Sequence, residues 1–298
     1  MPIIDLKEIS KLYGFGDATT VALDEVSLSI EKGEFIAVMG PSGSGKTTLM
    51  NMIGLLDKPT HGNYKLNSRD ASRITKNRLA KLRRDNSGFI FQSFNLLPKL
   101  TVLENVALPL AYKGTRQTRR LKAAEKVLAQ VGLNDRESYL PTQLSGGQLQ
   151  RAAIARALVN NPSIIIADEP TGNLDSVSAR VVMELLSDIH KLGNTVIMVT
   201  HNPSLTRYAD RIIYMRDGAI VYDEASVVGE VPKPVQKAIE ALRTSDDDEK
   251  LANVSAVMET IPESKPEDEN TKKQKKETIK KIKKARSARK KSRKGKKK

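Results

Sequence analysis

The chain has 298 residues, 39% of them hydrophobic, and a formal net charge of +15. It contains no cysteine, which excludes disulfide bonds and thiolate metal sites. Its longest apolar runs are far shorter than the roughly 18 residues that a membrane helix needs, and no signal peptide is expected at the N-terminus. Any membrane involvement is therefore expected through a partner or a surface contact.

The beginning of the chain predicts a pair of antiparallel strands. Apolar and polar residues alternate in IIDLKEISKLY (3–13) and again in VALDEVSLSIEKGEF (21–35). Such alternation is typical of strands that bury one face. The stretch EKGE within the second segment is expected to form a turn.

Three continuous apolar runs predict a second kind of sheet. They are FIAVMG (35–40), SIIIAD (163–168) and TVIMVTH (195–201). Each has a helical pattern before or after it, for example ARVVMELLSDIHKLG, which is expected to stop at Gly193. Apolar strands separated by helices indicate a mainly parallel sheet that is covered on both faces.

The remaining pattern completes an α/β fold within residues 1–225. Residues from about 94 to 158 are expected to form a helical insertion, because segments such as TRRLKAAEKVLAQVGL have helical spacing. The stretch YMRDGAIVYDE predicts a closing hairpin around Asp217 and Gly218.

The motif GPSGSGKT follows the first apolar run and predicts a phosphate-binding loop. Its glycines allow consecutive backbone N–H groups to turn toward phosphate oxygens, and the helix that follows adds the positive end of its dipole. The lysine can reach the terminal phosphates, and the first threonine can bind Mg²⁺. An ordinary Gly/Ser turn is the alternative. The predicted ATP-binding residues are Gly40, Pro41, Ser42, Gly43, Ser44, Gly45, Lys46, Thr47 and Thr48.

Two acidic residues end the second apolar run. Asp168 is expected at the carboxyl end of a strand, where α/β sheets bind ligands, and it can hold Mg²⁺ directly or through water. Glu169 follows and can accept a proton from an attacking water. The alternative is that both are solvated turn residues.

A second glycine-rich helix start occurs about a hundred residues after the first. Ser145, Gly146, Gly147 and Gln148 precede a helical pattern with a buried face. Free N–H groups at a helix start attract anions. The same residues also fit a plain N-cap with glycines at the entry turn, and the local pattern alone does not separate the two interpretations.

The segment LSGGQ at 144–148 resembles the signature of ATP-binding-cassette (ABC) ATPases. A phosphate-binding loop precedes it and IIIADEPTGNLD follows it, in the order of that family. The resemblance covers roughly residues 3–225. It implies a P-loop cassette with a mainly parallel core sheet, an antiparallel β subdomain and a helical insertion. It also implies a head-to-tail homodimer, in which the Ser145 loop contacts the partner's ATP. ATP binding closes such a dimer and hydrolysis reopens it.

The resemblance assigns further roles one residue at a time. Tyr13 matches the aromatic residue that stacks on adenine, although a half-buried strand tyrosine is the alternative. Gln92 matches a glutamine that contacts Mg²⁺ and water, and Asp175 matches a loop that touches the opposite subunit. His201 matches the histidine that contacts the γ-phosphate, so the predicted catalytic residues are Glu169, His201 and Gln92, and the metal ligands are Thr47, Gln92 and Asp168. The other histidines, His61 and His190, are expected in solvent.

The segments GFIFQSFNLLPKLTVLENVALPL and ADEPTGNLDS look most like those of MacB-like, LolD-like and FtsE-like cassettes. This resemblance implies a cytoplasmic ATPase at the inner face of the membrane that drives a separate integral membrane permease. In the family, the region 94–106 contacts the permease. Phe94, Leu96, Leu97 and Leu100 are candidate docking residues, and packing within the insertion itself is the alternative.

The end of the chain differs in composition from the rest. Residues 226–270 are polar, charged and contain proline, which predicts a mostly flexible linker. Residues 271–298 carry 17 Lys and Arg against one acid, Glu277, so residues 1–270 together have a net charge of −1. The basic tail is predicted to be disordered. The tail can be a solvated run, or it can bind an anionic membrane surface. Nucleic acid fits less well, because the tail lacks aromatic residues. A soluble ABC ATPase that acts on nucleic acid or ribosomes is thus the alternative function.

Overall fold

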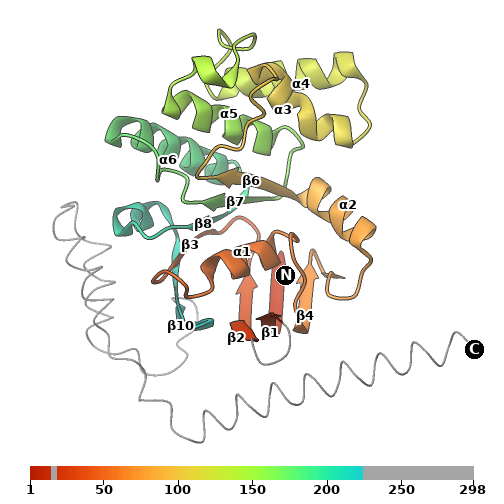
Figure 1. The fold of residues 1–298 in the computed structure, drawn as a ribbon, viewed down its shortest axis with the longest axis vertical. Helices are drawn as coiled ribbons and strands as arrows, with labels where there is room; N and C mark the ends of the chain where they lie inside the picture. The colour runs from red at the N-terminus through yellow and green to blue at the C-terminus, as the bar shows by residue number, and fades with distance from the viewer. Residues whose placement is uncertain (15–18, 224–298) are drawn as a thin grey trace, which may run out of the picture.

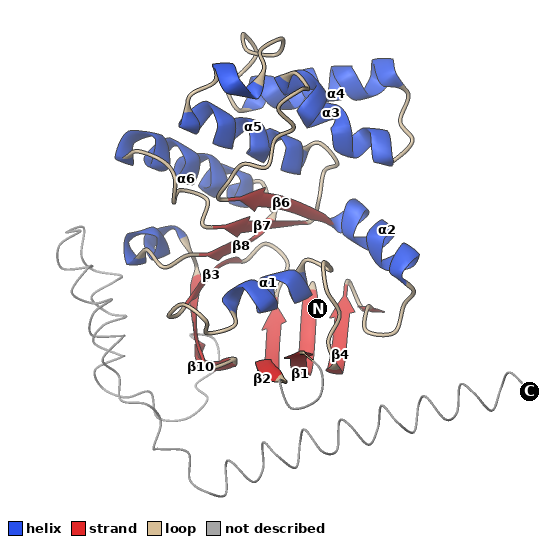
Figure 2. Ribbon diagram, in the orientation of Figure 1, coloured by secondary structure: helices blue, strands red, loops and turns tan. Residues whose placement is uncertain are grey.

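The computed structural model describes residues 1–14 and 19–223, which form two sheets with helices around them (Figure 1). The predicted linker and basic tail lie outside the described residues. The first sheet has the strand order β2-β1-β4-β5, and the second has the order β10-β9-β3-β8-β7-β6. Figure 2 shows the same arrangement by secondary structure.

The four-stranded sheet is antiparallel. Its members are β1 (Ile4–Tyr13), β2 (Thr20–Ile30), β4 (His61–Leu66) and β5 (Arg69–Asp70). β1 pairs with both β2 and β4, for example through Ile4 with Ile30 and with Leu66. The predicted antiparallel pair is confirmed, whereas β4 and β5 have no counterpart in the sequence-based prediction.

The six-stranded sheet is mainly parallel, as predicted. Its members are β3 (Phe35–Met39), β6 (Ser87–Phe91), β7 (Ile164–Asp168), β8 (Thr195–Val199), β9 (Arg211–Arg216) and β10 (Ala219–Asp223). β3, β6, β7, β8 and β9 run parallel, and β10 closes the edge as the antiparallel partner of β9. The predicted hairpin is therefore confirmed, with Asp217 and Gly218 at its turn.

Helices cover both faces of this sheet. They are α1 (Lys46–Ile53), α2 (Lys76–Asn86), α3 (Val102–Tyr112), α4 (Gln117–Gln130), α5 (Gly146–Leu158) and α6 (Ser176–Lys191), with short 3₁₀ turns at Pro141–Gln143 and Pro203–Tyr208. In Figure 1, α5 and α6 lie on one side of the sheet, with α3 and α4 stacked beyond α5. α1 and the antiparallel sheet lie on the other side.

The continuous apolar strands contribute side chains to two hydrophobic cores, one on each face of the sheet. In β7, Ile165 and Ala167 pack into the core shared with α3–α6, whereas Ile164 and Ile166 pack into the core shared with α1 and the antiparallel sheet. Successive side chains of a strand point to opposite faces, so a strand between two cores needs an apolar residue at nearly every position. This explains why these strands do not alternate in sequence.

The expectation that His190 lies in solvent is wrong. It stands in the last turn of α6, and its Nε2 is 2.8 Å from the Gly33 carbonyl oxygen and 3.1 Å from a carboxylate oxygen of Asp210. Because a carbonyl oxygen only accepts, this nitrogen carries the hydrogen. His190 thus ties the end of α6 to the loops that enter β3 and β9.

The last described strand is anchored by a buried ion pair. Arg211 of β9 donates from Nε and Nη2 to the two carboxylate oxygens of Asp223, at 2.7 and 2.6 Å, and Nη1 donates to the Ser29 carbonyl at 2.9 Å. This two-pronged geometry is the strongest that arginine forms with a carboxylate. It fixes β10 to the body of the fold at the point where the described chain ends.

No helix among the residues that the structure describes is long and apolar enough to cross a membrane.

Candidate active site

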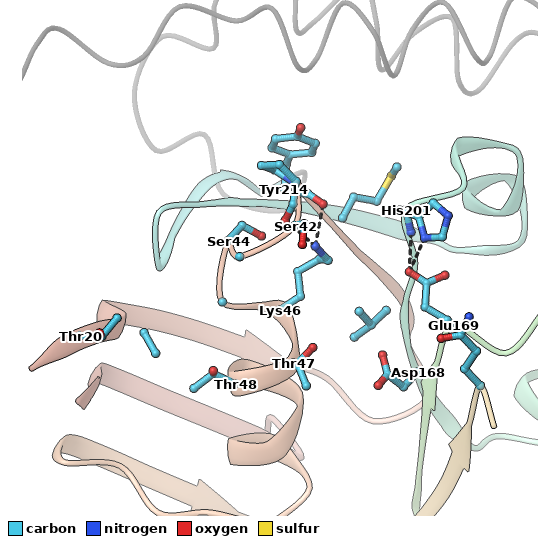
Figure 3. Close-up of a pocket in the computed structure, with 18 of the residues that line it drawn as sticks. Thr20, Ser42, Ser44, Lys46, Thr47, Thr48, Asp168, Glu169, His201 and Tyr214 are labelled. Carbon is cyan, nitrogen blue, oxygen red and sulfur yellow. Dashed lines mark hydrogen bonds and ion pairs between the residues drawn. The ribbon is translucent and has the colours of Figure 1, made fainter. Parts of the chain in front are cut away.

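The strand ends and the start of α1 surround one cavity of about 540 Å³ (Figure 3). This volume is within the range of small-molecule sites. The lining includes every residue from Gly40 to Thr48, together with Gln92, Asp168, Glu169 and His201. Thr20, Val21, Ala22, Met39, Val199 and Tyr214 complete it. The fold therefore brings together residues that are up to 194 positions apart in the sequence, from Thr20 to Tyr214.

Glycine is required at two points of the loop that enters α1. Gly40 has φ +146°, and a Cβ there would lie 2.1 Å from the Met215 carbonyl oxygen. Gly45 has φ +98°, and a Cβ there would lie 2.5 Å from the Ala22 carbonyl oxygen. Side chains cannot be accommodated at either point, so the loop backbone itself forms the wall of the cavity.

The N-terminus of α1 has the features that an anion requires. Its N-cap is Gly45, and no side chain caps the helix. The first N–H groups of a helix have no acceptor within the helix and carry its positive dipole end. The neighbouring Ser44 Oγ is buried and has no hydrogen-bond partner among the described residues. A phosphate group would satisfy this set of donors, so the residues present fit a nucleotide.

Lys46 brings a positive charge into the same cavity. Its ammonium donates to the carbonyl oxygens of Gly40 and Pro41, each at 2.7 Å. Burial lowers the pKa of Lys46, while the nearby charges of Glu169 and Asp168 act in the opposite direction. The ammonium is thus held inside its own loop, facing the two acids across the cavity.

The two acids differ in their surroundings. Asp168 is the last residue of β7, and burial, followed by the charge of Glu169, raises its pKa above the ordinary value, with Lys46 opposing the shift. Glu169 has left-handed backbone (φ +46°), held by a hydrogen bond from its N–H to the Val199 carbonyl at 2.9 Å. A non-glycine residue in this region is uncommon and frequent at functional sites.

Glu169 is held by the residues that follow β8. Its Oε1 accepts the His201 backbone N–H at 2.9 Å and lies 2.7 Å from His201 Nδ1 (Figure 3). Its Oε2 accepts the Thr200 hydroxyl at 3.3 Å. The carboxylate is largely covered, with 17% of its side chain exposed, whereas the His201 side chain is 73% exposed. His201 therefore presents its outer ring atoms to whatever enters the cavity.

Gln92 reaches the cavity from the end of β6. Its backbone carbonyl oxygen accepts a hydrogen bond from Asn173 Nδ2 at 3.0 Å, and its side-chain Nε2 is 3.5 Å from Asn173 Oδ1. Gly172 lies beside it, because a Cβ on Gly172 would be 2.7 Å from Gln92 Nε2. The loops after β6 and β7 are therefore in direct contact next to the two acids.

Ser145 and Asp175 lie outside this cavity, at neighbouring helix starts. Ser145 caps α5: its Oγ accepts from the Gln148 N–H at 3.4 Å, and Gln148 Oε1 accepts the Ser145 N–H at 3.0 Å. Asp175 caps α6 and accepts from the N–H groups of Val177 and Ser178. Gly147 is needed here because a Cβ would lie 2.7 Å from the Ser178 hydroxyl. The N-cap interpretation of Ser145 thus describes its contacts within one chain.

Tyr13 also stays outside the cavity lining. It ends β1 and is 43% exposed. Its hydroxyl donates to Asp57 at 3.0 Å, and the Lys11 ammonium sits 4.9 Å from the ring centroid. Burial, followed by the hydrogen bond with Asp57, raises the pKa of Tyr13. One face of the ring is therefore occupied by Lys11, and the edge is fixed by Asp57.

The cavity fits a magnesium ion bound together with a nucleotide. In the part of the chain that is described, no group of three or more His, Cys, Asp or Glu side chains could hold a metal by itself. Mg²⁺ usually takes one or two protein ligands, with water and phosphate oxygens as the rest. Thr47, Gln92 and Asp168 all line the cavity and provide oxygen donors of the required kind.

The sequence did not indicate the partners that hold the active residues. Thr200 is buried and binds Glu169, and Asp57 fixes Tyr13, yet neither belongs to a recognised motif. The position of Thr200 between a strand end and a histidine is the one available signal. Such contacts depend on which strands become neighbours, which the local pattern does not determine.

The chain matches known proteins over about three quarters of its length. The model of the family described as "ABC transporter" matches residues 23–172. The chain is 49% identical over 222 residues to the ABC transporter ATP-binding protein YvrO of Bacillus subtilis, covering 74% of this chain and 97% of the relative. It is 53% identical to the ABC transporter ATP-binding protein MJ1508 of Methanocaldococcus jannaschii, covering 74% and 98%.

Two further matches extend the comparison. The macrolide export ATP-binding/permease protein MacB of Mannheimia succiniciproducens is 49% identical over 223 residues, which are 75% of this chain and 35% of that longer protein. A solved dimeric structure of MJ0796, described as a bacterial ABC transporter cassette, is 46% identical. It superposes with a TM-score of 0.69, covering 74% of this chain and 97% of the solved chain.

Proposed function

The chain belongs to the ABC transporter family as an ATP-hydrolysing subunit of the MacB-like group, and from this premise we propose how two copies drive a separate permease. Two chains pair head to tail and enclose ATP between them. Binding of ATP closes the pair, and hydrolysis reopens it. This opening and closing is transmitted to an integral membrane partner, which places the ATPase at the cytoplasmic face of the membrane.

The observation that carries the proposal is the single cavity shared by Lys46, Asp168, Glu169 and His201. Enzymes of phosphoryl transfer act mainly by positioning groups and neutralising charge. Lys46 and the α1 N-terminus would neutralise the phosphates, and Glu169 would take the proton of the attacking water. His201 would contact the γ-phosphate, and Gln92 would orient the water.

Thr47 and Asp168 would hold Mg²⁺, with Gln92 beside it. When bound, this ion supplies positive charge to the phosphate oxygens. The raised pKa of Asp168 reflects burial of its charge, and a cation at that point would favour the ionised form.

The Ser145 loop would serve the partner's nucleotide. Ser145 uses its oxygen as an acceptor within its own chain, so its hydroxyl hydrogen stays available for a phosphate oxygen of the partner. The two capped helix starts, at Ser145 and Asp175, lie together on an exposed surface. The dimeric cassette structures at 46% identity support this arrangement.

Removing the Ser145 hydroxyl tests the dimeric site. We expect Ser145→Ala to lower kcat for ATP hydrolysis about 10- to 100-fold, the usual effect of a lost hydrogen bond to a charged group. ATP binding to the dilute, monomeric chain should be unchanged, because that chain binds through its own Gly40–Thr48 loop. Steady-state hydrolysis and equilibrium nucleotide binding measure the two effects.

Thr101→Ala is the matched control for this test. Thr101 caps α3 through the same reciprocal pattern with Glu104 and does not line the cavity. Both variants lose an N-cap, worth roughly 1 kcal/mol of stability, and only Ser145→Ala should lose turnover. Equal kcat values for the two variants, or a hydrolysis rate per chain that is independent of chain concentration, would contradict the shared site.

Tyr13 would position adenine. Because Lys11 occupies one face of the ring, the base would stack on the opposite face. Stacking of a base on an aromatic ring is worth about 1–3 kcal/mol. The hydroxyl bond to Asp57 would hold the ring in place before the nucleotide arrives.

A groove between the helical insertion and the core would receive the permease. It is lined by the apolar residues Phe89, Phe91, Leu108 and Tyr112 and by the cations Lys81, Arg83, Arg84 and Arg156, with no acidic side chain. Asp85, beside the groove, pairs with Arg84 at 2.8 Å. The remaining charges fit an amphipathic helix with acidic residues, and the groove adjoins Gln92 through Phe91. The predicted docking residues Phe94, Leu96, Leu97 and Leu100 do not line this groove, and Leu96 packs into the insertion's core.

Tyr112 is the residue that would report on this docking. It is 73% exposed at the end of α3. We expect Tyr112→Glu to reduce co-purification of the multi-span permease by at least tenfold, because it removes an apolar contact and its charge repels a helix with acidic residues. Leu192→Glu, at an 84% exposed residue away from the groove, is the control. Equal recovery of the permease, identified by mass spectrometry, with both variants would contradict the assignment.

The relatives favour transport over an ATPase that acts on nucleic acid. Those compared are 45–53% identical and are described as transporter or export proteins. The basic tail would then add attraction to an anionic membrane surface, where each Lys or Arg contributes about 1 kcal/mol.

A further inference from the structure

The helix that begins at Ser145 also contacts the loop that carries Glu169 of the same chain. Gln150 lies in α5, one turn beyond the cap, and is fully buried. Its Nε2 donates to the Pro170 carbonyl oxygen at 2.7 Å. Pro170 directly follows Glu169, so one hydrogen bond joins α5 to the backbone beside the proposed general base.

Beside the bonds that the Glu169 carboxylate forms with Thr200 and His201, the backbone of this loop is bound at a small number of points. Glu169 has left-handed backbone, its N–H is bound to Val199, and its carbonyl accepts the Gly172 N–H at 3.1 Å. Pro170 contributes no N–H. The bond from Gln150 is therefore a contact through which a shift of α5 would reach the Glu169 backbone.

Gln150 is an unfavourable choice if its role were packing alone. Its Oε1 is buried and has no hydrogen-bond partner among the described residues. A buried acceptor without a partner lowers stability, and an apolar side chain of the same shape would avoid the loss. The amide is thus present for its donor, which binds Pro170.

The other end of α5 holds a second catalytic segment. Arg156 donates from Nη2 to the Phe94 carbonyl at 2.9 Å and from Nη1 to the Asn95 carbonyl. Phe94 and Asn95 both have left-handed backbone, with φ +59° and +51°. They follow Gln92 closely, so α5 is in contact with the loops that carry both Glu169 and Gln92.

We propose that Gln150 is a positioning residue that makes the placement of Glu169 depend on the anchoring of its own α5 at the partner's nucleotide. The inference rests on the proposed function, because Ser145 must contact the partner's ATP. Gln150 already holds Pro170 in the single chain; when the Ser145 end of α5 is fixed, α5 can move less, and Glu169 stays aligned for the chain's own ATP. Each nucleotide thereby promotes hydrolysis of the other, and the pair reacts as a unit.

A double-mutant cycle on kcat tests this coupling. Gln150→Met keeps the length of the side chain and removes the donor. We expect it to lower kcat about tenfold, to leave KM for ATP within about twofold, and to leave ATP-driven dimerisation intact in a Glu169→Gln background. In a Ser145→Ala background the same change should lower kcat less than twofold. Equal factors in both backgrounds, or an effect on KM alone, would overturn the proposal.

Hydrogen–deuterium exchange of the nucleotide-free chain gives a second readout. The peptide that spans residues 169–174 should exchange faster in Gln150→Met. Tyr64→Phe is the matched control, since it also removes a buried side-chain donor from a carbonyl, that of Ile53 at 2.6 Å, in the other core. It should change neither exchange at 169–174 nor kcat. Unchanged exchange in Gln150→Met, or the same change in Tyr64→Phe, would overturn the proposal.

Gln150→Glu is a second test variant, for the case that Gln150→Met does not fold. A buried carboxyl has a raised pKa; while protonated it can donate to Pro170, and once ionised it cannot. Relative to the wild type, its kcat should fall as pH rises. A constant ratio across pH would overturn the proposal. If the wild-type chain does not hydrolyse ATP and the Glu169→Gln chain does not pair in ATP, the proposed function and this inference are both overturned. If the wild type hydrolyses ATP normally and the Gln150 variant is unaffected, the inference alone is overturned.

Discussion

Glu169→Gln is expected to lower kcat for ATP hydrolysis about 10²- to 10⁴-fold, the usual contribution of a positioned general base. ATP affinity should hold or increase, because the substitution removes a negative charge from the wall of a cavity that receives phosphates. The chain should then accumulate as a closed dimer with ATP. Steady-state hydrolysis and size-exclusion chromatography with and without ATP measure both effects.

The surroundings of Glu169 explain why this variant should keep its structure. Gln retains an oxygen that accepts the His201 N–H, and its amide group can donate to the Thr200 hydroxyl oxygen. The substitution also affects Asp168, because the charge of Glu169 is one cause of the raised pKa of Asp168. That pKa should fall in the variant, which favours the ionised form that would bind Mg²⁺ under the proposed function.

Glu184→Gln is the matched control, since it makes the same chemical change on the exposed side of α6. It should hydrolyse ATP at the wild-type rate and show no trapped dimer. A Glu169→Gln chain that retains kcat within twofold of the wild type would remove Glu169 from the role of general base. A variant that is inactive but never pairs in ATP would instead contradict the closing of the dimer by nucleotide.

The elements with strong local patterns were predictable. The runs that became β3, β7 and β8 were recognised because each lies between two cores and must be apolar at successive positions. The Gly40–Thr48 loop was recognised because phosphate binding by backbone N–H groups requires glycine at fixed points, as Gly40 and Gly45 show.

Elements that owe their structure to neighbours were not predictable in the same way. β6 (Ser87–Phe91) is short and contains Gly88, a position where a Cβ would lie 2.6 Å from the Ala157 carbonyl of α5. Gly88 therefore allows α5 to approach, and the strand is held by its parallel pairing with β7. α2 (Lys76–Asn86) buries only Leu79, so its sequence carries almost no apolar periodicity.

The same distinction applies within the site. Asp168 and Glu169 were identified because a strand end delivers them, whereas the contacts of Gln150 and Arg156 depend on where α5 crosses the sheet. For His190 the sequence-based expectation was wrong. A histidine near a helix end was assigned to solvent, yet the pairing of β3 with β9 brings Gly33 and Asp210 to it.

Lys46→Met is expected to weaken ATP binding about 30-fold or more, since loss of one member of a buried charged hydrogen-bonded pair usually costs about 2–5 kcal/mol. The ammonium would face the phosphates, and the chain has two acids on the far side of the same cavity. Without Lys46, the charges of Asp168 and Glu169 would meet the nucleotide with less compensation. Equilibrium binding of ATP to the monomeric chain measures the loss.

The stability of the nucleotide-free chain should not fall with the same substitution. Burial lowers the pKa of Lys46, which means that folding disfavours its charged form at neutral pH. Methionine removes this charge at similar length, and this gain opposes the loss of the bonds to Gly40 and Pro41. Urea unfolding measures the free energy, and Lys32→Met, at an exposed turn, is the control. Unchanged ATP affinity would contradict the role of Lys46 in nucleotide binding. A large loss of stability would show that its ammonium mainly stabilises the folded loop.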